Sequence, residues 1–360
     1  MQQIDFSQGS IRRRILAVAT PMLIAQLLNL LYNIVDRIYI GKIPGEGTLA
    51  LASIGLCFPF VTLITAFANL FGLGGAPLCA MARGKGNREG AQGIMVNAGF
   101  MLLLSGAVLT VLGIAFHRPL LYLFGASEVT YPYASSYIVI YLLGTLCVML
   151  SLGLNPYINC QGFARTGMLT VALGAAANIV LDPIFIFALH LGVRGAAIAT
   201  VLSQFLSAAW VVKFLTGKKA ELKLDFRGFC PDWHCIQRIT VLGIASFVMS
   251  FTDMLVQVAC NSMLRGFGGD LYISVMTVLN SVRQIAQTPV LAIADGASTA
   301  ISYNYGAGLY KRTRDAIRFM TQIAIGYTML VWMLVSLFPA LFIRIFNQDA
   351  ELVAAAVPAL

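Results

Sequence analysis

Four polar side chains lie on one face of an otherwise apolar segment near the N-terminus. Gln26, Asn29, Asn33 and Asp36 are three, four and three residues apart, which is the spacing of one face of an α-helix. Such a face is costly next to lipid, so it has to point toward other parts of the protein. Its amide and carboxylate groups could bind a cation or exchange a proton there.

A second set of polar groups follows at a matching depth. Asn178 and Asp182 are four residues apart, Pro183 comes next, and Thr200 lies in the following apolar segment. The proline removes a helical donor and so frees a nearby carbonyl. Asp36, Asp182 and Thr200 each lie about five to seven residues from the same end of their segments, roughly 8–11 Å from the rim of a bilayer. These oxygen atoms could bind Na⁺, or the two carboxylates could share one proton.

The alternative interpretation is a structural polar cluster in which Asp36 pairs with Arg37. Adjacent residues in a helix point about 100° apart, which makes this pairing poor. The spacing therefore favours a cation-coupling site but leaves the structural cluster open.

Two later segments carry further polar residues. Ser246, Ser250, Asp253 and Gln257 follow a helical spacing, and Gln284, Gln287 and Asp295 lie in the next segment. They could line a cavity that attracts cationic molecules, or Arg283 could neutralise one of the aspartates. The candidates for cavity-lining residues are Gln26, Asn29, Asn33, Asp253, Gln257, Gln284, Gln287 and Asp295.

The elements that position these residues follow from composition. The chain has 360 residues, of which 59% are hydrophobic and 11% charged, whereas soluble domains have about 25% charged residues. Most of the chain must therefore lie in lipid. The apolar runs do not alternate as barrel strands do, so they predict an all-α polytopic membrane protein. Nine spans are expected, at 15–40, 49–74, 91–116, 133–157, 167–189, 195–216, 239–264, 271–303 and 316–342.

The basic residues orient the chain. With the N-terminus in the cytoplasm, most Lys and Arg residues fall in cytoplasmic connections, as the positive-inside rule requires. The net charge of +9 comes from these short clusters and does not predict nucleic-acid binding. The longest polar connection, 217–238, divides the chain into an N-lobe at 1–216, a cytoplasmic linker and a partial C-lobe at 239–360.

An internal repeat supports two lobes. The separation of 222 residues between Gly84 and Gly306 also relates Gly74 to Gly296, and it superposes the first three spans on the seventh to ninth. An even shift of six helices preserves direction, so the lobes form a parallel repeat typical of alternating-access transporters. A complete second unit would extend about 84 residues beyond Leu360. We therefore expect a truncated C-lobe that has three helices and, at 351–360, the start of a tenth.

Other chemistry is not indicated. The seven cysteines and three histidines match no metal-binding spacing, and the Gly84-Lys85-Gly86 sequence lacks the earlier glycine of a phosphate-binding loop. We expect no enzymatic activity, no cofactor, and no metal beyond a possible Na⁺ at the coupling site. Without a nucleotide-binding domain, transport would run on an ion gradient.

Four segments resemble the multidrug and toxic compound extrusion (MATE) family, most closely its bacterial multidrug-efflux branch. They are Pro21 to Gly41, Gly72 to Asn87, Asn178 to Pro183 and Gly195 to Thr200. The resemblance implies twelve helices in two six-helix lobes and exchange of a drug for Na⁺ or H⁺. It implies an N-lobe cation site formed by Asp36, Asn178, Asp182 and Thr200, and a helix-bending role for Pro21.

These observations together predict a secondary antiporter that exports small organic, often cationic, compounds. We expect a monomer with several spans in the prokaryotic plasma (inner) membrane, in contact with lipid and small-molecule substrates. One alternative is a related lipid-linked oligosaccharide flippase, although its cavity should carry several cationic groups. The other is a membrane receptor or assembly factor without transport activity, although paired carboxylates on facing helices argue against it.

Overall fold

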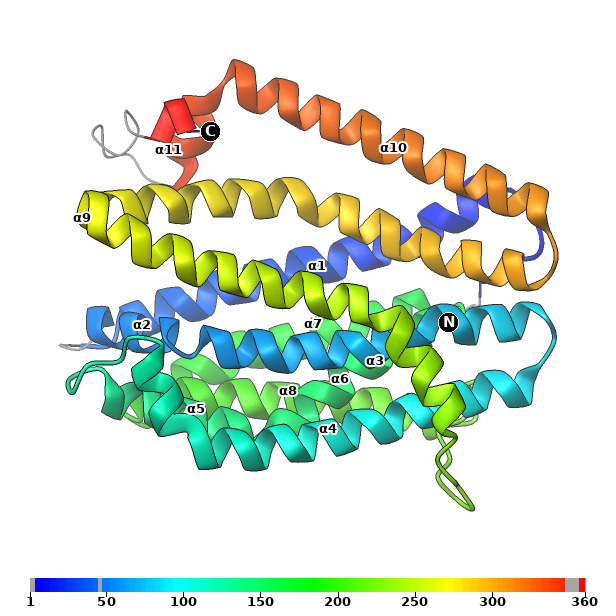
Figure 1. Ribbon diagram of the computed structural model, residues 1–360, viewed down its shortest axis with the longest axis horizontal. Coiled ribbons are helices and arrows are strands. Elements are labelled where there is room, and N and C mark those ends of the chain that lie inside the picture. The colour runs from blue at the N-terminus through cyan, green and yellow to red at the C-terminus, as the bar shows by residue number, and fades with distance from the viewer. Residues whose placement is uncertain (1–3, 45–46, 347–355, 360) are drawn as a thin grey trace.

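The computed structural model describes residues 4–44, 47–346 and 356–359, and all regular structure in these ranges is helical. The long helices lie side by side in an elongated bundle (Figure 1). The elements are α1 (Ile11–Gly41), α2 (Gly47–Gly55), α3 (Phe58–Gly84), α4 (Arg88–Leu123), α5 (Tyr131–Leu143), α6 (Thr145–Cys160), α7 (Ala164–Pro183), η1 (Ile184–Ala188), α8 (Gly192–Thr216), α9 (Trp233–Gly306), α10 (Tyr310–Leu337), α11 (Pro339–Phe346) and η2 (Val357–Ala359).

Helices of membrane-spanning length dominate the described part of the chain. Seven are long and apolar enough to cross a bilayer, and the pair of α5 and α6, which is bent by 56°, brings the number to eight if the pair crosses as one span. The expected span at 271–303 lies in the second half of α9, where several side chains are outside the described set. The count of nine therefore stays a prediction. The expected start of a tenth helix at 351–360 lies mostly outside the described residues.

Helix α9 has 74 residues and folds back on itself, so that its two halves run antiparallel (Figure 1). It begins at Trp233, inside the connection predicted at 217–238, because Asp232 caps its first turn. The Asp232 carboxylate accepts hydrogen bonds from the backbone N–H groups of His234 and Cys235. A side-chain acceptor at this position stabilises the start of a helix.

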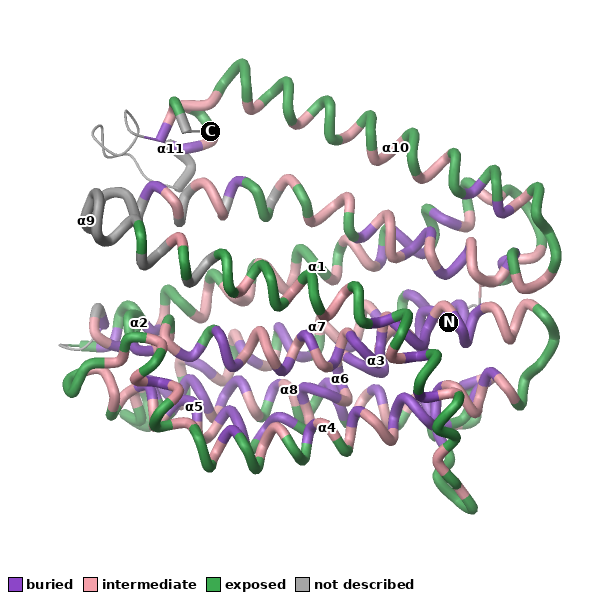
Figure 2. Tube along the Cα trace, viewed as in Figure 1, coloured by how far each residue is buried: buried purple, intermediate pink, exposed green. Residues whose placement is uncertain are grey.

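The core lies in the first bundle, which we define as α1 to α8. Buried residues gather in α3, α6 and α8, whereas α10 is mostly exposed (Figure 2). Its largest core cluster includes Met95, Leu102, Met149 and Tyr157. Large apolar side chains such as Leu123 and Val111 are exposed on the outside. A surface of this kind is stable when it faces lipid tails.

The second bundle, formed by α9 to α11, packs on the first through pairs of close backbone contacts related by the 222-residue repeat. A Cβ at Gly84 would lie 2.0 Å from the carbonyl oxygen of Tyr303, and one at Gly306 would lie 2.1 Å from that of Met81. Neither contact leaves room for a side chain. Because Gly84 and Gly306 exchange equivalent partners, the repeat is visible as an approximate two-fold relation between α3 and α9.

A similar pair of contacts lies ten residues earlier on the same two helices, at Gly74 and Gly296. A Cβ at Gly74 would lie 2.8 Å from Gly243 of α9, and one at Gly296 would lie 2.9 Å from Ala19 of α1. Small residues at these positions let the backbones of the two bundles approach closely. The helices α1 and α3 of the first bundle form the most extensive contacts with α9, and α4 and α6 add smaller ones.

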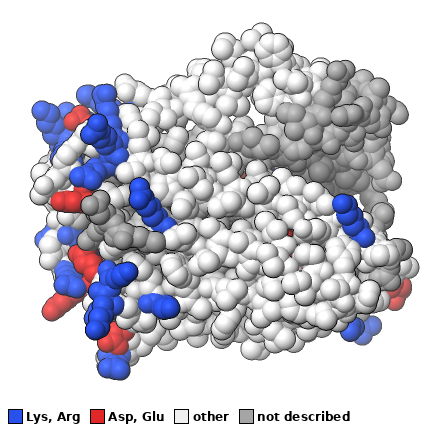
Figure 3. Space-filling view, turned by 180° about the vertical axis from the view of Figure 1, so that it is seen from behind, with Lys and Arg blue, Asp and Glu red and all other residues white. Residues whose placement is uncertain are grey.

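Charge is strongly asymmetric along the bundle. Lys and Arg side chains gather at one end of the molecule (Figure 3). This end, which we call the basic end, contains the end of α3, the starts of α4 and α10, and the connection between α8 and α9. Lys42, Arg118 and Arg194 lie in or beside connections at the opposite end.

Candidate functional site

The polar stripe of α1 meets the polar face of α7. The two helices pack against each other, and α7 also packs on α8. Asn178 and Asp182 are almost completely buried, with exposed fractions of 2% and 0%. Asp36 is half-buried. The three side chains therefore converge in the interior of the first bundle, in the half farther from the basic end.

The two carboxylates are neighbours. Asp36 and Asp182 are close enough for their side chains to interact, and the Asn178 Nδ2 atom donates to Asp182 Oδ1 at 3.1 Å. Two carboxylates at this separation in an apolar interior repel each other when both are ionised, so a shared proton or a bound cation stabilises the pair.

Three oxygen atoms of this group have no hydrogen-bonding partner. They are Asp36 Oδ1, Asn178 Oδ1 and Asp182 Oδ2, and each is buried. Buried acceptors without partners are rare, and each needs an explanation. Carboxylate and amide oxygens are hard ligands, which suit a small alkali cation or a proton better than a transition metal.

Arg37 does not occupy the site. Its guanidinium group stacks over the Phe58 ring, 4.9 Å from the ring centroid. The side chain of Arg37 is exposed, whereas Asp36 turns toward Asp182. This geometry disfavours the pairing of Asp36 with Arg37 as the reason for the polar stripe.

Thr200 and Pro183 border the same region. Thr200 is buried on α8, and its hydroxyl donates to the Ala196 carbonyl at 2.9 Å. The oxygen of that hydroxyl keeps its acceptor capacity. Pro183 ends α7 and is followed by the π-helical turn η1, a feature that often marks functional sites. No contact of Thr200 with the carboxylates is established.

Two tyrosines near the carboxylates were not predicted from the sequence. Tyr32 of α1 is close enough to Asp36 and Asp182 to interact with both electrostatically, and Tyr137 of α5 lies close to Asp36. Tyr32 could have been found because it lies one turn before Asp36. Tyr137 had no such signal, because it lies on α5, far from Asp36 in the chain.

The candidate cavity residues are more dispersed. Asn29 and Asn33 are half-buried, and the Asn33 amide donates to the Asn29 carbonyl at 2.7 Å. Asp295 is half-buried next to Gly296, at the contact of α9 with α1. Gln26, Asp253, Gln284 and Gln287 have exposed side chains. The side chain of Gln257 is outside the described residues.

An apolar pocket of about 530 Å³ lies between α3, α4 and the first half of α9. Phe60, Leu112, Phe116 and Phe251 are among its lining residues. None of the predicted site residues lines it.

Comparisons with known proteins identify the family and the fold. The sequence model of the MatE family matches residues 21–184 and 245–360. The chain is 26% identical over 356 residues to the multidrug export protein MepA of Staphylococcus haemolyticus (strain JCSC1435), covering 99% of this chain and 78% of that protein. It is 22% identical to MepA of Staphylococcus saprophyticus over 98% of this chain and 77% of that protein.

Solved transporters share the fold. An outward-facing multidrug resistance MATE family transporter of the MOP superfamily has a TM-score of 0.91 and 25% identity, covering 100% of this chain and 80% of that one. A MOP superfamily transporter from Pyrococcus furiosus Vc1 has a TM-score of 0.90 with the same identity and coverage. These relatives are transporters and not enzymes, and their membrane location implies the plasma membrane for this multi-pass chain. The family model covers most of the chain, and the chain therefore belongs to the MatE family.

Proposed function

We propose that this protein is a secondary antiporter that exports small organic, often cationic, compounds in exchange for Na⁺ or H⁺. The observation that carries the proposal is the set of three buried, unpartnered oxygens on the neighbouring side chains Asp36, Asn178 and Asp182, in the interior of the first bundle. The coupling cation binds among Asp36, Asn178, Asp182 and Thr200. No cofactor takes part.

The position of α1 explains how the cation could be coupled to transport. This helix packs on α7 at the site and on α9 of the second bundle. A bound cation or proton removes the repulsion between Asp36 and Asp182, so α1 sits closer to α7 when the site is filled. A shift of α1 then changes its contact with α9, at Ala19 and Gly296. Occupancy of the site thereby biases the relative position of the two lobes.

Pro21 provides the flexible point in this scheme. It is buried within the continuous helix α1, two residues after Ala19. A proline inside a helix removes one backbone hydrogen bond and lowers the cost of bending. The part of α1 that carries Asn29, Asn33 and Asp36 can therefore tilt about Pro21, and this tilt alters the packing of the preceding turn, at Ala19, against α9.

The substrate binds between the lobes, where the half-buried Asp295 supplies negative charge. Asp253 and the glutamines at 26, 284 and 287 remain candidates for its cavity, with Asn29 and Asn33 on the side of α1. The positive-inside rule supports an orientation with the basic end, and with it the N-terminus, in the cytoplasm. The protein works as a monomer.

The test is gradient-driven transport by the protein in proteoliposomes, measured with a fluorescent organic cation under an imposed Na⁺ or pH gradient. Asp36→Asn and Asp182→Asn should each abolish gradient-driven transport, because removal of one charge removes the repulsion that cation binding relieves. Asp315→Asn, on the exposed surface of α10, is the matched control and should transport normally. Wild-type rates in both site variants would contradict the proposal. Comparison of the two gradients identifies the coupling ion.

A further inference from the structure

The segment before α1 is held between the two bundles. We call residues 4–9 the N-terminal strap. Phe6 is buried to an exposed fraction of 1%, and its ring lies 5.6 Å from that of Tyr303 in α9. It belongs to a small apolar cluster with members from both bundles, which are Ile15, Val18, Ala164, Ala297, Ala300 and Ala316.

One arginine of the second bundle holds the backbone of the strap. The Arg312 guanidinium donates to the Gly9 carbonyl at 2.9 Å and to the Phe6 carbonyl at 3.1 Å, and its Nε donates to Asn304 Oδ1 at 3.1 Å. The buried Asn304 amide also donates to the Phe6 carbonyl, at 3.3 Å. Charge-assisted bonds from a rigid guanidinium fork are stronger than neutral ones.

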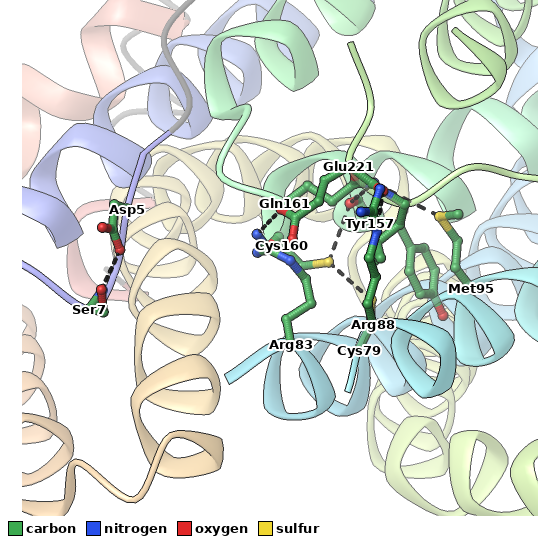
Figure 4. A network of polar contacts seen from close by, with 11 residues as sticks. Asp5, Ser7, Cys79, Arg83, Arg88, Met95, Tyr157, Cys160, Gln161 and Glu221 are labelled. Carbon is green, nitrogen blue, oxygen red and sulfur yellow. Dashed lines mark hydrogen bonds and ion pairs between the residues drawn. The ribbon is translucent and has the colours of Figure 1, made fainter. Parts of the chain in front are cut away.

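The strap is also attached to the first bundle. The backbone N–H of Ile4 donates to the Gly162 carbonyl at 3.0 Å, in the connection between α6 and α7. The strap then continues directly into α1. A short turn shapes it, because the Asp5 carboxylate accepts hydrogen bonds from the Ser7 N–H and hydroxyl groups. Figure 4 shows this turn beside the polar network of the first bundle.

We propose that the N-terminal strap is a latch that joins the two bundles at the basic end and holds that end closed. Its contacts with Arg312, Asn304 and Tyr303 lie beside the close approach of Gly84 to Tyr303. The end of α3 cannot separate from the end of α9 without release of these contacts or detachment of Ile4 from Gly162. The inference rests on the proposed function, since it assumes that the lobes move relative to each other.

The latch is built to be reversible. Three of its acceptors are backbone carbonyls, at Phe6, Gln8 and Gly9, and two of these residues are exposed. Water can replace Arg312 at such carbonyls when the strap leaves. The buried Phe6 ring supplies most of the attachment that water cannot replace.

Distance measurement between spin labels at the basic end tests the latch. Labels are placed at Lys85→Cys and Lys311→Cys, both exposed and on opposite bundles, in the full chain with its seven native cysteines replaced. Double electron–electron resonance then measures the fraction of molecules with a long label distance. Arg312→Gln should raise the ratio of open to closed molecules about fivefold, because it removes charge-assisted bonds to the strap. Arg314→Gln, an exposed neighbour with the same charge change, should leave the ratio unchanged.

A second variant acts from the other side of the contact. Phe6→Ser should open the basic end to a similar extent. It replaces Arg312→Gln in the test if size-exclusion chromatography shows that Arg312→Gln does not fold. Distances in both variants equal to those of Arg314→Gln would overturn the latch. The distances are recorded without substrate or gradient, so they are separate from the transport test. Normal transport by Asp36→Asn with opening by Arg312→Gln would reject the antiport proposal and keep the latch.

Discussion

The N-terminal strap and the connection between α8 and α9, residues 217–232, occupy similar places in the chain but are held differently. Each precedes the first helix of a bundle, and both lie at the basic end. The connection returns to the bundle from which it came, whereas the strap crosses to the other one. Two segments that are equivalent in the repeat therefore have different mechanical roles: the connection moves with the first bundle, and the strap links both.

The contacts of the connection show why it cannot easily detach. Arg83 of α3 forms an ion pair with Glu221 and donates to the Cys160 carbonyl, as drawn in Figure 4. The buried Gln161 accepts the Leu222 N–H at 2.9 Å. At its far end, the Asp232 N–H donates to Asn97 Oδ1 at 3.0 Å. Buried and charge-assisted bonds of this kind are costly to break.

The largest expected effect is the loss of Arg83. Arg83→Ala removes a partner of Glu221 and of the Cys160 carbonyl, and it should lower the free energy of unfolding by about 3 kcal/mol. Thermal unfolding in detergent measures the change. Lys85→Ala, two residues away and exposed, should have almost no effect. Equal melting temperatures for the two variants would show that the connection is only loosely attached.

Gln161→Leu sharpens the comparison. Gln161 follows α6 in the first bundle, and the substitution removes the side chain that accepts the Leu222 N–H of the connection. The Leu222 N–H is then buried without this acceptor, which should cost about 1–3 kcal/mol. Hydrogen exchange of residues 217–232 should rise, while exchange at Tyr303 and Asn304 stays as in the wild type. Increased exchange at α9 as well would mean that the connection and the second bundle are coupled.

Arg312→Gln should change stability less than either of these variants. Its strap contacts lie close to water, so a loss of about 1 kcal/mol or less is expected, together with the opening described above. Hydrogen exchange should rise at Ile4 and Ser7. A destabilisation as large as that of Arg83→Ala would mean that the strap is attached as firmly as the connection, which would contradict the difference proposed between the two segments.

The smallest effect concerns Asp5. Hydrogen bonds from the Ser7 side chain and backbone hold the pKa of Asp5 below its ordinary value of 3.8. A lowered pKa in the folded state means that the turn is stabilised above about pH 3.8 and loses this contribution as the pH falls through the lower value. Asp5→Asn should therefore raise the open fraction slightly at neutral pH and remove the dependence of the open fraction on pH below about 3.8. An unchanged pH dependence would assign the titration to another group.

The sequence predicts those features that depend on periodicity within one helix. The stripe at Asn29, Asn33 and Asp36 and the pair Asn178 and Asp182 follow from helical spacing. The repeat could be found because Gly74 and Gly84 recur as Gly296 and Gly306. Membrane composition removes most alternatives to helix, which explains why the fold class was accessible.

Features that depend on contacts between residues far apart in the chain could not be predicted from the sequence. In the sequence, Arg312 resembles the other basic residues at the end of a membrane helix. Its role depends on the strap, where its partner Gly9 is 303 residues earlier in the chain. Phe6 lies in a polar terminus without periodicity. Tyr137 lies on α5, far from Asp36 in the chain, and comes close to it only in the folded bundle. None of these positions has a local pattern that distinguishes it from its neighbours.

The exchanged contacts at Gly84 and Gly306 have a consequence for how the basic end can be forced apart. A methyl group at only one of these positions pushes α3 and α9 apart on one side of their approximate two-fold axis, so the ends of the two helices must tilt relative to each other. Methyl groups at both positions push on both sides of the axis, so the ends of α3 and α9 must separate evenly without tilting. The glycine pair therefore behaves as one mechanical unit, and a change at either position alters the direction of the motion as well as its cost.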